Sequence, residues 1–477
     1  MASVRDQVEA YNYAARRQVL ALLQGDDTVP VDPRRRLNRS LFGGLLLGMV
    51  VLAAVGVAGF LSSGGSTSLP SDGVIVDADT GAAYVRIGDV LHPALNMTSA
   101  KLIAGHDVTK VSSATLRSVP RGLPVGIPGA PEALPPSDEL TTHAWSVCTI
   151  APQASAARSQ VVVSVGAPTP TPVPEDGGLV AQGPDQTVWL LDNGQRYQVS
   201  DAASTLLGLY QVPPLAMDAE VLDLVPEGPP LDVPKIPGAG RPPTTSLPFD
   251  ALVGDLVKVN NGTNQPGLYV VMQDGVTPVN EFAFSLLAGG AEHTLTEPAG
   301  AIVSVPAKTR PDIPALWPRQ ALRRPVPPPA ADEPFCITYD PHAPHSAAAW
   351  PVTFSEPVTI PLGKHAVPVT ASGASLPTAA TGVAVPPGGG ALVKAVGSGG
   401  VDAVYTLVTD SGLRFSITNA DAVGRLGYNP STAITVPLPF VKLLPAGPGL
   451  DPNAAATEYA GAAEAPAATA TPSGVPS

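Results

Sequence analysis

The stretches TVWLLDNGQRYQVSDAASTLLGL at 187–209 and AVYTLVTDSGLRFSITNADAVGRLG at 403–427 repeat one another and indicate the fold. When a two-residue insertion is allowed before the turn, the turn residues align in pairs: Asp192 with Asp410, and Gly194 with Gly412. In each copy an alternating apolar strand runs into an Asp/Gly turn, where glycine supplies the positive φ that a tight hairpin needs. A short apolar helix opened by Ser, Thr, Asp or Asn follows. The repeated unit is therefore predicted to be a β-hairpin plus a helix.

Two weaker copies bring the count to four. They lie at 74–105 and at 268–289, and the second of them contains the turn Asp274-Gly275. One such unit buries little apolar surface, so the units should pack on each other or on a central domain. We therefore expect an α+β fold with a β-rich body, in which four hairpin-plus-helix repeats surround a central β domain.

Proline-rich connections set the expected domain limits. The segments 166–178, 226–243 and 323–334 are typical of stiff, extended spacers. The predicted order along the body is repeat 1 (62–115), the first segment of the central domain (116–180), repeat 2 (181–245), repeat 3 (246–300), the second segment of the central domain (301–395) and repeat 4 (396–452). Residues 453–477 are rich in Ala, Thr and Pro, and we expect a disordered tail there.

An apolar run near the N-terminus predicts one membrane span. Residues 41–61 carry no charged or strongly polar side chain, and at about 1.5 Å rise per residue they match the ~30 Å bilayer core. Four arginines precede the run: Arg34, Arg35, Arg36 and Arg39. By the positive-inside rule the N-terminus is cytosolic and the body lies on the periplasmic or cell-wall side of the plasma membrane. A cleaved signal peptide is the alternative, but a run that begins this far into the chain fits a retained anchor better.

The cytosolic piece, residues 1–40, contains a predicted amphipathic helix at 4–23 followed by a basic linker. Its apolar positions recur at spacings of three and four: Val4, Val8, Tyr11, Ala15, Val19 and Leu22. Two interpretations stay open. The helix lies on the membrane surface or is weakly ordered, or it docks to a cytosolic partner.

Charge separates the two sides of the predicted membrane. The chain carries a net −13; residues 1–40 hold seven Arg against five Asp or Glu, a net of +2, which leaves −15 for the rest. An acidic body lacks the clustered Lys and Arg that replace counterions on phosphates. Sequence-independent nucleic-acid binding is therefore excluded.

The chain has two cysteines, Cys148 and Cys336, each in a short strand-like stretch on the export side. Pairing is expected in an oxidising compartment and would staple two strands of the central domain. The alternative is two buried free thiols. A redox CxxC motif or a cysteine metal site is excluded by count and spacing.

Catalytic motifs are missing from the sequence, and we predict no catalytic, cofactor-binding or metal-binding residue. No GxxxxGK[ST] P-loop or GxSxG elbow occurs, and the glycine-rich run at 386–395 lacks the P-loop order. His342 and His345, with Asp340, lie in a proline-interrupted stretch that predicts a solvated loop rather than a metal site. His92 is expected to have a hydrogen-bonded structural role.

Several segments together resemble the EccB family, the single-pass subunit of the actinobacterial type VII (ESX) secretion machine. They are RDQVEAYNYAARR (5–17), LHPALNMTSAKLIAG (91–105), RGLPVGIPGAPEALP (121–135), WSVC (145–148), DSGLRF (410–415) and LLPAGPGLDP (443–452). The resemblance implies a cytosolic N-terminus, a disulfide between Cys148 and Cys336, and four repeats around a central β-rich domain. It also implies assembly with the subunits EccC, EccD and EccE.

The resemblance leads to a ranked set of functions. The first is a structural membrane subunit whose body oligomerises to help shape the export path for small helical secreted proteins. The alternative is a peptidoglycan-binding anchor, because the family's repeats look like phage-lysin cell-wall-binding modules. An ATP-hydrolysing subunit is a distant third: family members have been described as ATPases, but this chain lacks the motif. No cofactor is expected.

Overall fold

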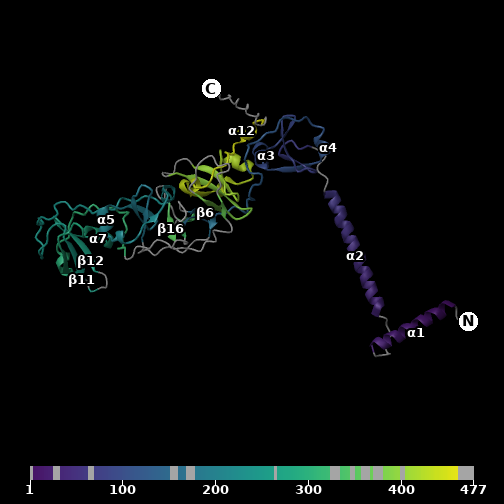
Figure 1. Ribbon diagram of the computed structural model, residues 1–477, viewed down its shortest axis with the longest axis horizontal. Helices are drawn as coiled ribbons and strands as arrows, with labels where there is room; N and C mark the ends of the chain where they lie inside the picture. The colour runs from purple at the N-terminus through teal and green to yellow at the C-terminus, as the bar shows by residue number, and fades with distance from the viewer. Residues whose placement is uncertain are drawn as a thin grey trace, which may run out of the picture. The chain divides into compact units, whose positions relative to one another are not determined.

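In a computed structural model, most of the chain is described. The described residues are 4–24, 33–62, 69–150, 160–167, 178–260, 262, 266–322, 334–343, 350–355, 366–368, 380–397 and 403–459. The chain forms two compact units, one of Met1–Leu69, Asp77–Gly81 and Lys110–Ser118, and the other of Pro70–Val76, Ala82–Thr109 and Val119–Ser477. The first holds the long helices α1 and α2, and the second holds most of the β-structure (Figure 1).

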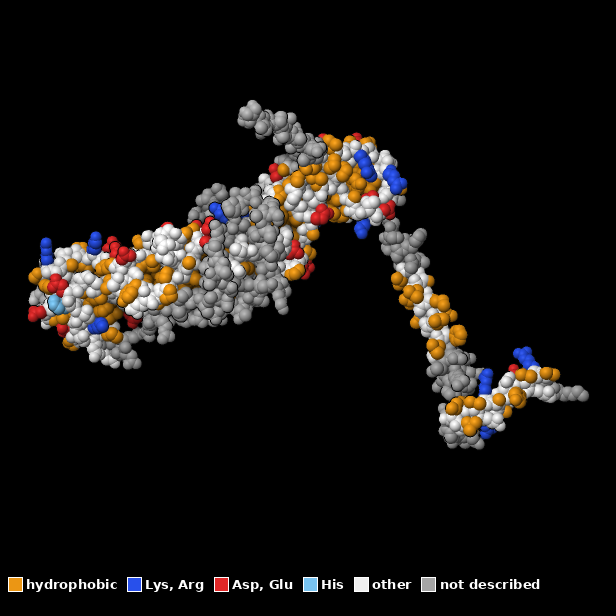
Figure 2. All heavy atoms as spheres, in the orientation of Figure 1, with side chains coloured by type: hydrophobic (Ala, Val, Ile, Leu, Met, Phe, Trp, Pro, Cys, Tyr) orange, Lys and Arg blue, Asp and Glu red, His pale blue; other side chains and the backbone are white. Residues whose placement is uncertain are grey.

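Helix α1 spans Val4–Gln24, which confirms the predicted amphipathic helix. The large apolar side chains of its predicted face are all more than half exposed: Val4, Val8, Tyr11, Val19 and Leu22. Figure 2 shows hydrophobic side chains along this helix. The face is thus formed but unpaired within the portion of the unit that the structure describes.

Helix α2 spans Pro33–Ser62 and contains the apolar run 41–61. The side chains of Arg34, Arg35, Arg36 and Arg39, and those of residues 56–61, lie outside the described residues. Across the portion of the chain that is described, no helix combines the length and the apolar character needed to cross a membrane.

Four small sheets share one strand order. The first two sheets are β3-β2-β1-β4 (Val90–Pro93, Ala83–Ile87, Val74–Asp77, Val108–Val111) and β9-β8-β7-β10 (Gln195–Gln198, Val188–Asp192, Leu179–Gln182, Leu215–Ala216). The other two are β13-β12-β11-β14 (Gly275–Pro278, Gly267–Met272, Leu256–Asn260, Thr294–Pro298) and β21-β20-β19-β22 (Arg414–Ile417, Val404–Thr409, Gly390–Val396, Ile434–Pro437). Along the chain, the first three strands of each sheet are antiparallel. In the second, third and fourth sheets the last strand then pairs in parallel with the first strand: β10 with β7, β14 with β11 and β22 with β19.

Each sheet carries a short helix after its third strand: α3 (Met97–Ala104), α5 (Asp201–Leu206), α7 (Glu281–Leu287) and α10 (Ala420–Arg425). The residue before each helix, Asn96, Ser200, Asn280 or Asn419, accepts a hydrogen bond from a backbone N–H of the first turn. The predicted hairpins and helices are therefore present. The strand before the hairpin in the last three sheets (β7, β11 and β19) and the strand after each helix were not predicted. β7 and β19 begin ahead of the predicted starts of repeats 2 and 4.

A closing segment follows each sheet and lies parallel to its third strand. The paired residues are Leu91 with Arg121, Arg196 with Glu227, Val276 with Pro306, and Arg414 with Ala446. These segments include the similar stretches LVPEGPPLD and LLPAGPGLD at 224–232 and 443–451. The closing segment thus covers an edge that would otherwise be open to strand pairing.

A fifth sheet has six strands in the order β16-β15-β5-β6-β18-β17. Their bounds are Val352–Ser355, Pro334–Tyr339, Ala144–Ile150, Gln160–Ala167, Gly382–Ala384 and Ala366–Pro368. One face of this central sheet shares a hydrophobic core with residues of the second and fourth small sheets, among them Leu191 and Val408. Further cores join helix α3 of the first unit to the fourth sheet, and the second sheet to helix α7 of the third unit.

The C-terminal end corrects one expectation. Residues 453–459, predicted to begin a disordered tail, are ordered: α12 (Pro452–Ala455) is capped by Asp451, and Ala455 is fully buried. Small alanines pack closely against α3, which composition alone does not indicate. The rest of the predicted tail, 460–477, lies outside the described residues.

Candidate functional site

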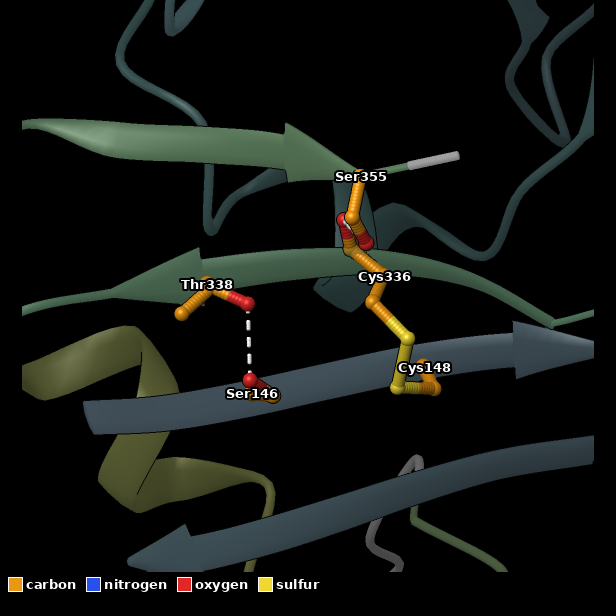
Figure 3. Close-up of a disulfide and its surroundings, with 5 residues drawn as sticks. All are labelled: Ser146, Cys148, Cys336, Thr338 and Ser355. Carbon is orange, nitrogen blue, oxygen red and sulfur yellow. Dashed lines mark hydrogen bonds between the residues drawn. A yellow bond between two sulfur atoms is a disulfide. The ribbon is translucent and has the colours of Figure 1, made fainter. Parts of the chain in front are cut away.

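The two cysteines join the middle of the central sheet. Cys148 in β5 and Cys336 in β15 are direct register partners, their sulfurs are bonded, and both are fully buried. The hydroxyls of Ser146 and Thr338 lie 2.7 Å apart on the same two strands (Figure 3). The predicted disulfide is therefore present, and the alternative of two free thiols is wrong. The bond connects strands that are 188 residues apart.

Two of the predicted turns contact the central sheet. A Cβ atom added at Gly194 would lie 2.5 Å from the carbonyl oxygen of Val352 in β16, and one at Gly412 would lie 3.1 Å from Cβ of Val383 in β18. Both glycines have positive φ, as the hairpin turns require. Because β16 is one edge of the sheet and β18 lies next to the other edge, these two turns contact the central sheet near its two opposite edges.

The third predicted turn has a different neighbour. A Cβ atom at Gly275 would lie 2.4 Å from the carbonyl oxygen of Val305, in the closing segment of its own sheet. Asp274 accepts hydrogen bonds from the backbone N–H groups of Lys308 (3.0 Å) and Thr309 (3.1 Å). The hydrogen bond from the Thr309 hydroxyl and these amides hold the pKa of Asp274 below its usual value. This turn therefore packs against the closing segment of its own sheet and not against the central sheet.

The carboxylates of the other two turns differ in their surroundings. Asp410 is exposed and accepts a 2.8 Å hydrogen bond from the backbone N–H of Gly388. Asp192 is 2% exposed and accepts a 3.0 Å hydrogen bond from the side chain of Asn193. Burial raises the pKa of Asp192 to about 6, although the hydrogen bond from Asn193 opposes the shift. A similar sequence thus gives one solvated and one buried acid.

Several hydrogen bonds from side chains to backbone carbonyls of distant segments were not predicted from the sequence. The Arg425 guanidinium of α10 donates to the carbonyl oxygens of Leu102 (3.3 Å) and Ile103 (3.1 Å) at the end of α3. The Trp350 indole donates to the Leu224 carbonyl at 2.8 Å. Buried tyrosine hydroxyls make further ties of this kind: Tyr197 to Leu316, Tyr339 to Thr435 and Tyr428 to Pro135. Each tie joins residues far apart in sequence, so no local pattern indicates it.

Cations cover aromatic rings in three of the small sheets. Arg121 lies 5.2 Å from the centre of the Tyr84 ring, Arg196 lies 4.9 Å from Trp189, and Lys394 lies 5.3 Å from Tyr405. Arg196 also donates to Asp223 at 3.0 Å and to Glu227 at 3.3 Å. The covered ring faces are therefore already in use by cation–π contacts.

The histidines considered from the sequence have local roles. His92 Nδ1 lies 2.9 Å from the Leu123 carbonyl oxygen, a structural hydrogen bond of the expected kind. The backbone N–H of His342 donates to Asp340 at 2.8 Å, and His345 lies outside the described residues. No group of three or more His, Cys, Asp or Glu side chains that could hold a metal occurs among the residues described.

The arrangement is thus a disulfide-bonded sheet held between smaller sheets. Comparison with known proteins finds a match over residues 1–464 to the family described as "Type VII secretion system ESX-1, transport TM domain B". The "ESX-3 secretion system ATPase EccB3" of Mycolicibacterium smegmatis is 29% identical, covering 94% of this chain and 89% of the relative. The "ESX-2 secretion system ATPase EccB2" of Mycobacterium tuberculosis is 31% identical, covering 95% and 94%.

Solved structures show the same fold. The chain matches a subunit of "an intact ESX-5 inner membrane complex" with a TM-score of 0.66 and 26% identity, covering 96% of each chain. It matches the "EccB3 dimer from the ESX-3 core complex" with a TM-score of 0.66 and 26% identity, covering 81% of this chain and 100% of the other. The mixed α/β fold of several small sheets is therefore that of these subunits.

Proposed function

The chain belongs to the EccB family of type VII (ESX) secretion systems, and we propose that it is a structural membrane subunit of such a complex. In this proposal the four small sheets are repeats of one unit around the central sheet, and the body oligomerises to help shape the export path. The observation that carries the proposal is the match over 96% of both chains to a subunit of an intact ESX-5 inner membrane complex.

The apolar run 41–61 serves as the membrane anchor in this proposal. It lies within the 30-residue helix α2, and the arginines before it place the N-terminus in the cytosol by the positive-inside rule. The exposed apolar face of α1 would then be on the cytosolic side, available to a partner subunit or the membrane surface. The body would lie on the side where disulfides persist, as the Cys148–Cys336 bond requires.

ATP hydrolysis is assigned to a partner subunit. Several relatives carry "ATPase" in their names, but this sequence has no GxxxxGK[ST] pattern to hold the phosphates of ATP. A point substitution that abolished ATP turnover by the purified chain would overturn this assignment.

Peptidoglycan binding remains the alternative function. Aromatic rings that stack on sugars need an open face, and three candidate rings on the body are covered by Arg121, Arg196 and Lys394. These three rings are therefore poor sites for stacking on a sugar, whereas the Tyr210 side chain is 67% exposed. Sedimentation of the purified protein with insoluble peptidoglycan distinguishes the two, because a scaffold stays in the supernatant.

Affinity purification tests the main proposal. The tagged full-length protein is extracted from its native membrane in mild detergent, and the co-purifying proteins are identified by mass spectrometry. Recovery of other ESX membrane subunits, which the family resemblance identifies as EccC, EccD and EccE, is the expected result. Recovery of the chain alone across several detergents would contradict the proposal and favour a free-standing anchor.

A further inference from the structure

Each small sheet forms a unit with its helices and closing segment, and the third unit lacks a contact that the second and fourth make. In these three units the last strand leads into a short helix: α6 (Ala219–Leu222), α8 (Ala299–Val303) and α11 (Leu438–Lys442). Aligned on the proline that follows each helix, the equivalent pairs of residues are Val221 and Leu224, Ala301 and Ser304, and Phe440 and Leu443. The pairs of the second and fourth units are apolar and buried in the core of the central sheet, whereas Ala301 is half-buried and Ser304 is exposed. The third unit is therefore not fixed to the central sheet in this way.

Helix α7 attaches the third unit to the second unit instead. Its Phe284 and Leu287 side chains belong to the core of their own sheet. Its Phe282 and Leu286 side chains are fully buried in a different core, whose other members come mainly from the second unit. Among the described residues, the third unit contributes no buried side chain to the core around the central sheet. The third unit is thus held mainly by the second.

A strap, residues 313–322, follows the third unit along the chain and contacts both units. Toward the second unit, the Tyr197 hydroxyl donates to the Leu316 carbonyl oxygen at 2.6 Å. Toward the third unit, the Trp317 ring meets the Phe282 ring edge-on, with 6.3 Å between the ring centres. All three aromatic rings belong to the core that the two units share. The strap therefore fastens the third unit against the second.

The strap contains a polar group that the docked position leaves without a partner. The Trp317 side chain is 6% exposed, and its Nε1 has no hydrogen-bond partner among the described residues. A buried N–H without a partner destabilises the arrangement that buries it, and it regains hydrogen bonds with water when the strap lifts. Undocking of the third unit is therefore easier than it would be from a fully hydrogen-bonded joint.

We propose that the third unit is an arm that undocks from the second unit at the strap, while the second and fourth sheets stay packed on the disulfide-bonded central sheet. The arm keeps its own core in both positions, because Phe284 and Leu287 hold α7 on its sheet. A scaffolding role alone does not require such a motion, and the proposal does not depend on the export role. In an export complex the motion would let part of the body change position without loosening the central sheet.

Thiol labelling of the full-length protein in detergent tests the arm. Both native cysteines are in the disulfide, so an introduced cysteine is the only free thiol. Leu286→Cys places the thiol in the joint, and Leu287→Cys places it on the other buried face of the same helix, which is reached only when the third sheet unfolds. Both changes remove the same buried volume, and we expect labelling at 286 to be at least about tenfold faster than at 287. Equal rates would overturn the proposal, because the joint would then open only with unfolding.

Tyr197→Phe, added to each cysteine variant, tests the strap itself. It removes the hydrogen bond to Leu316 and should speed labelling at 286 about fivefold, with no change at 287. Tyr428→Phe is the matched control, because it removes the same kind of hydrogen bond, to Pro135, away from the strap. It should change neither rate. If Tyr197→Phe leaves labelling at 286 unchanged, or Tyr428→Phe raises it equally, the proposal is wrong.

Hydrogen exchange without any introduced cysteine decides the question if a cysteine variant does not fold. Tyr197→Phe alone should raise the exchange rate of the amides in 316–321 about fivefold, because the strap lifts more often. The amides of β12 bond within the third sheet and should keep their rates. An unchanged rate in 316–321, or an equal rise in β12, would contradict an arm that moves as a folded unit.

Discussion

Three glycines in the closing segments lie directly against a ring on the neighbouring strand. A Cβ atom would lie 2.3 Å from the His92 ring at Gly122, 2.4 Å from the Tyr197 ring at Gly228, and 2.2 Å from the Phe415 ring at Gly447. The third small sheet has Ala307 at the corresponding position, where the strand residue is the smaller Thr277. Residue size is therefore matched across this contact in every unit.

Gly228→Ala and Gly447→Ala should each destabilise the body. The added methyl group has to displace a buried aromatic ring, and overpacking of this kind costs about 1–3 kcal/mol. Thermal unfolding of the purified full-length protein measures the loss as a lower midpoint.

Gly424→Ala is the matched control. This glycine lies inside α10 with nothing within 4 Å of the added atom, and a helical Gly→Ala change stabilises by about 0.5–1 kcal/mol. If Gly228→Ala behaved like Gly424→Ala, the size matching would have no energetic meaning.

At this scale the sequence predicted residues whose role is local: the turn glycines followed from turn chemistry, and the capping residues Ser200 and Asn419 followed from capping preference. The cysteine pair, whose members lie 188 residues apart, was expected from the cysteine count and the oxidising compartment rather than from a local pattern. The burial of Asp192 did not follow, because nothing in the DNG turn itself indicates which distant segments cover it. The tyrosine ties also escaped prediction for this reason.

Among the elements, the end of α3 depends on a side chain from another sheet. Arg425 of α10 donates to the carbonyl oxygens of Leu102 and Ile103, which would otherwise lack helical partners, and its charge is favourable at a helix C-terminus. Arg425→Gln should cost about 1 kcal/mol, because the side chain is partly exposed. Faster hydrogen exchange at the end of α3 would report the loss.

The exposed Arg241 supplies the comparison for that variant. Arg241→Gln removes the same charge from a surface position and should leave exchange in α3 unchanged. Equal exchange in the two variants would show that net charge, rather than the cap on α3, is responsible.

Helices and hairpins could be predicted where neighbouring residues in the sequence indicate them. The hairpins and helices have turn glycines and capping residues, and they were found. The flanking strands were missed because strands such as β7 and β10 have two to four residues and pair with each other across a hairpin and a helix. A parallel pair of this kind has no turn between its strands to indicate it.

On the scale of the whole molecule, the disulfide closes the longest covalent loop in the body. Replacing Cys148 and Cys336 together by Ser should lower the free energy of unfolding by up to about 5 kcal/mol, since the 188-residue separation is no longer constrained in the unfolded chain. Denaturant unfolding with and without a reductant measures the difference. The double variant should not respond to the reductant, and a wild type that is equally insensitive once unfolded would contradict this account.

The last described residues hold the first small sheet to the fourth. Helix α12 packs against α3, Glu458 pairs with Val125, and the backbone N–H of Tyr459 donates to Pro124 at 2.7 Å. Deleting 452–477 removes all three contacts, so hydrogen exchange in α3 should become at least about tenfold faster and residues 119–127 should become sensitive to protease. Deleting only 460–477 keeps every one of these contacts and should leave both measurements unchanged. If the shorter deletion had the same effect as the longer one, residues beyond Tyr459 would be holding the first sheet, and the contacts of α12 would not be sufficient.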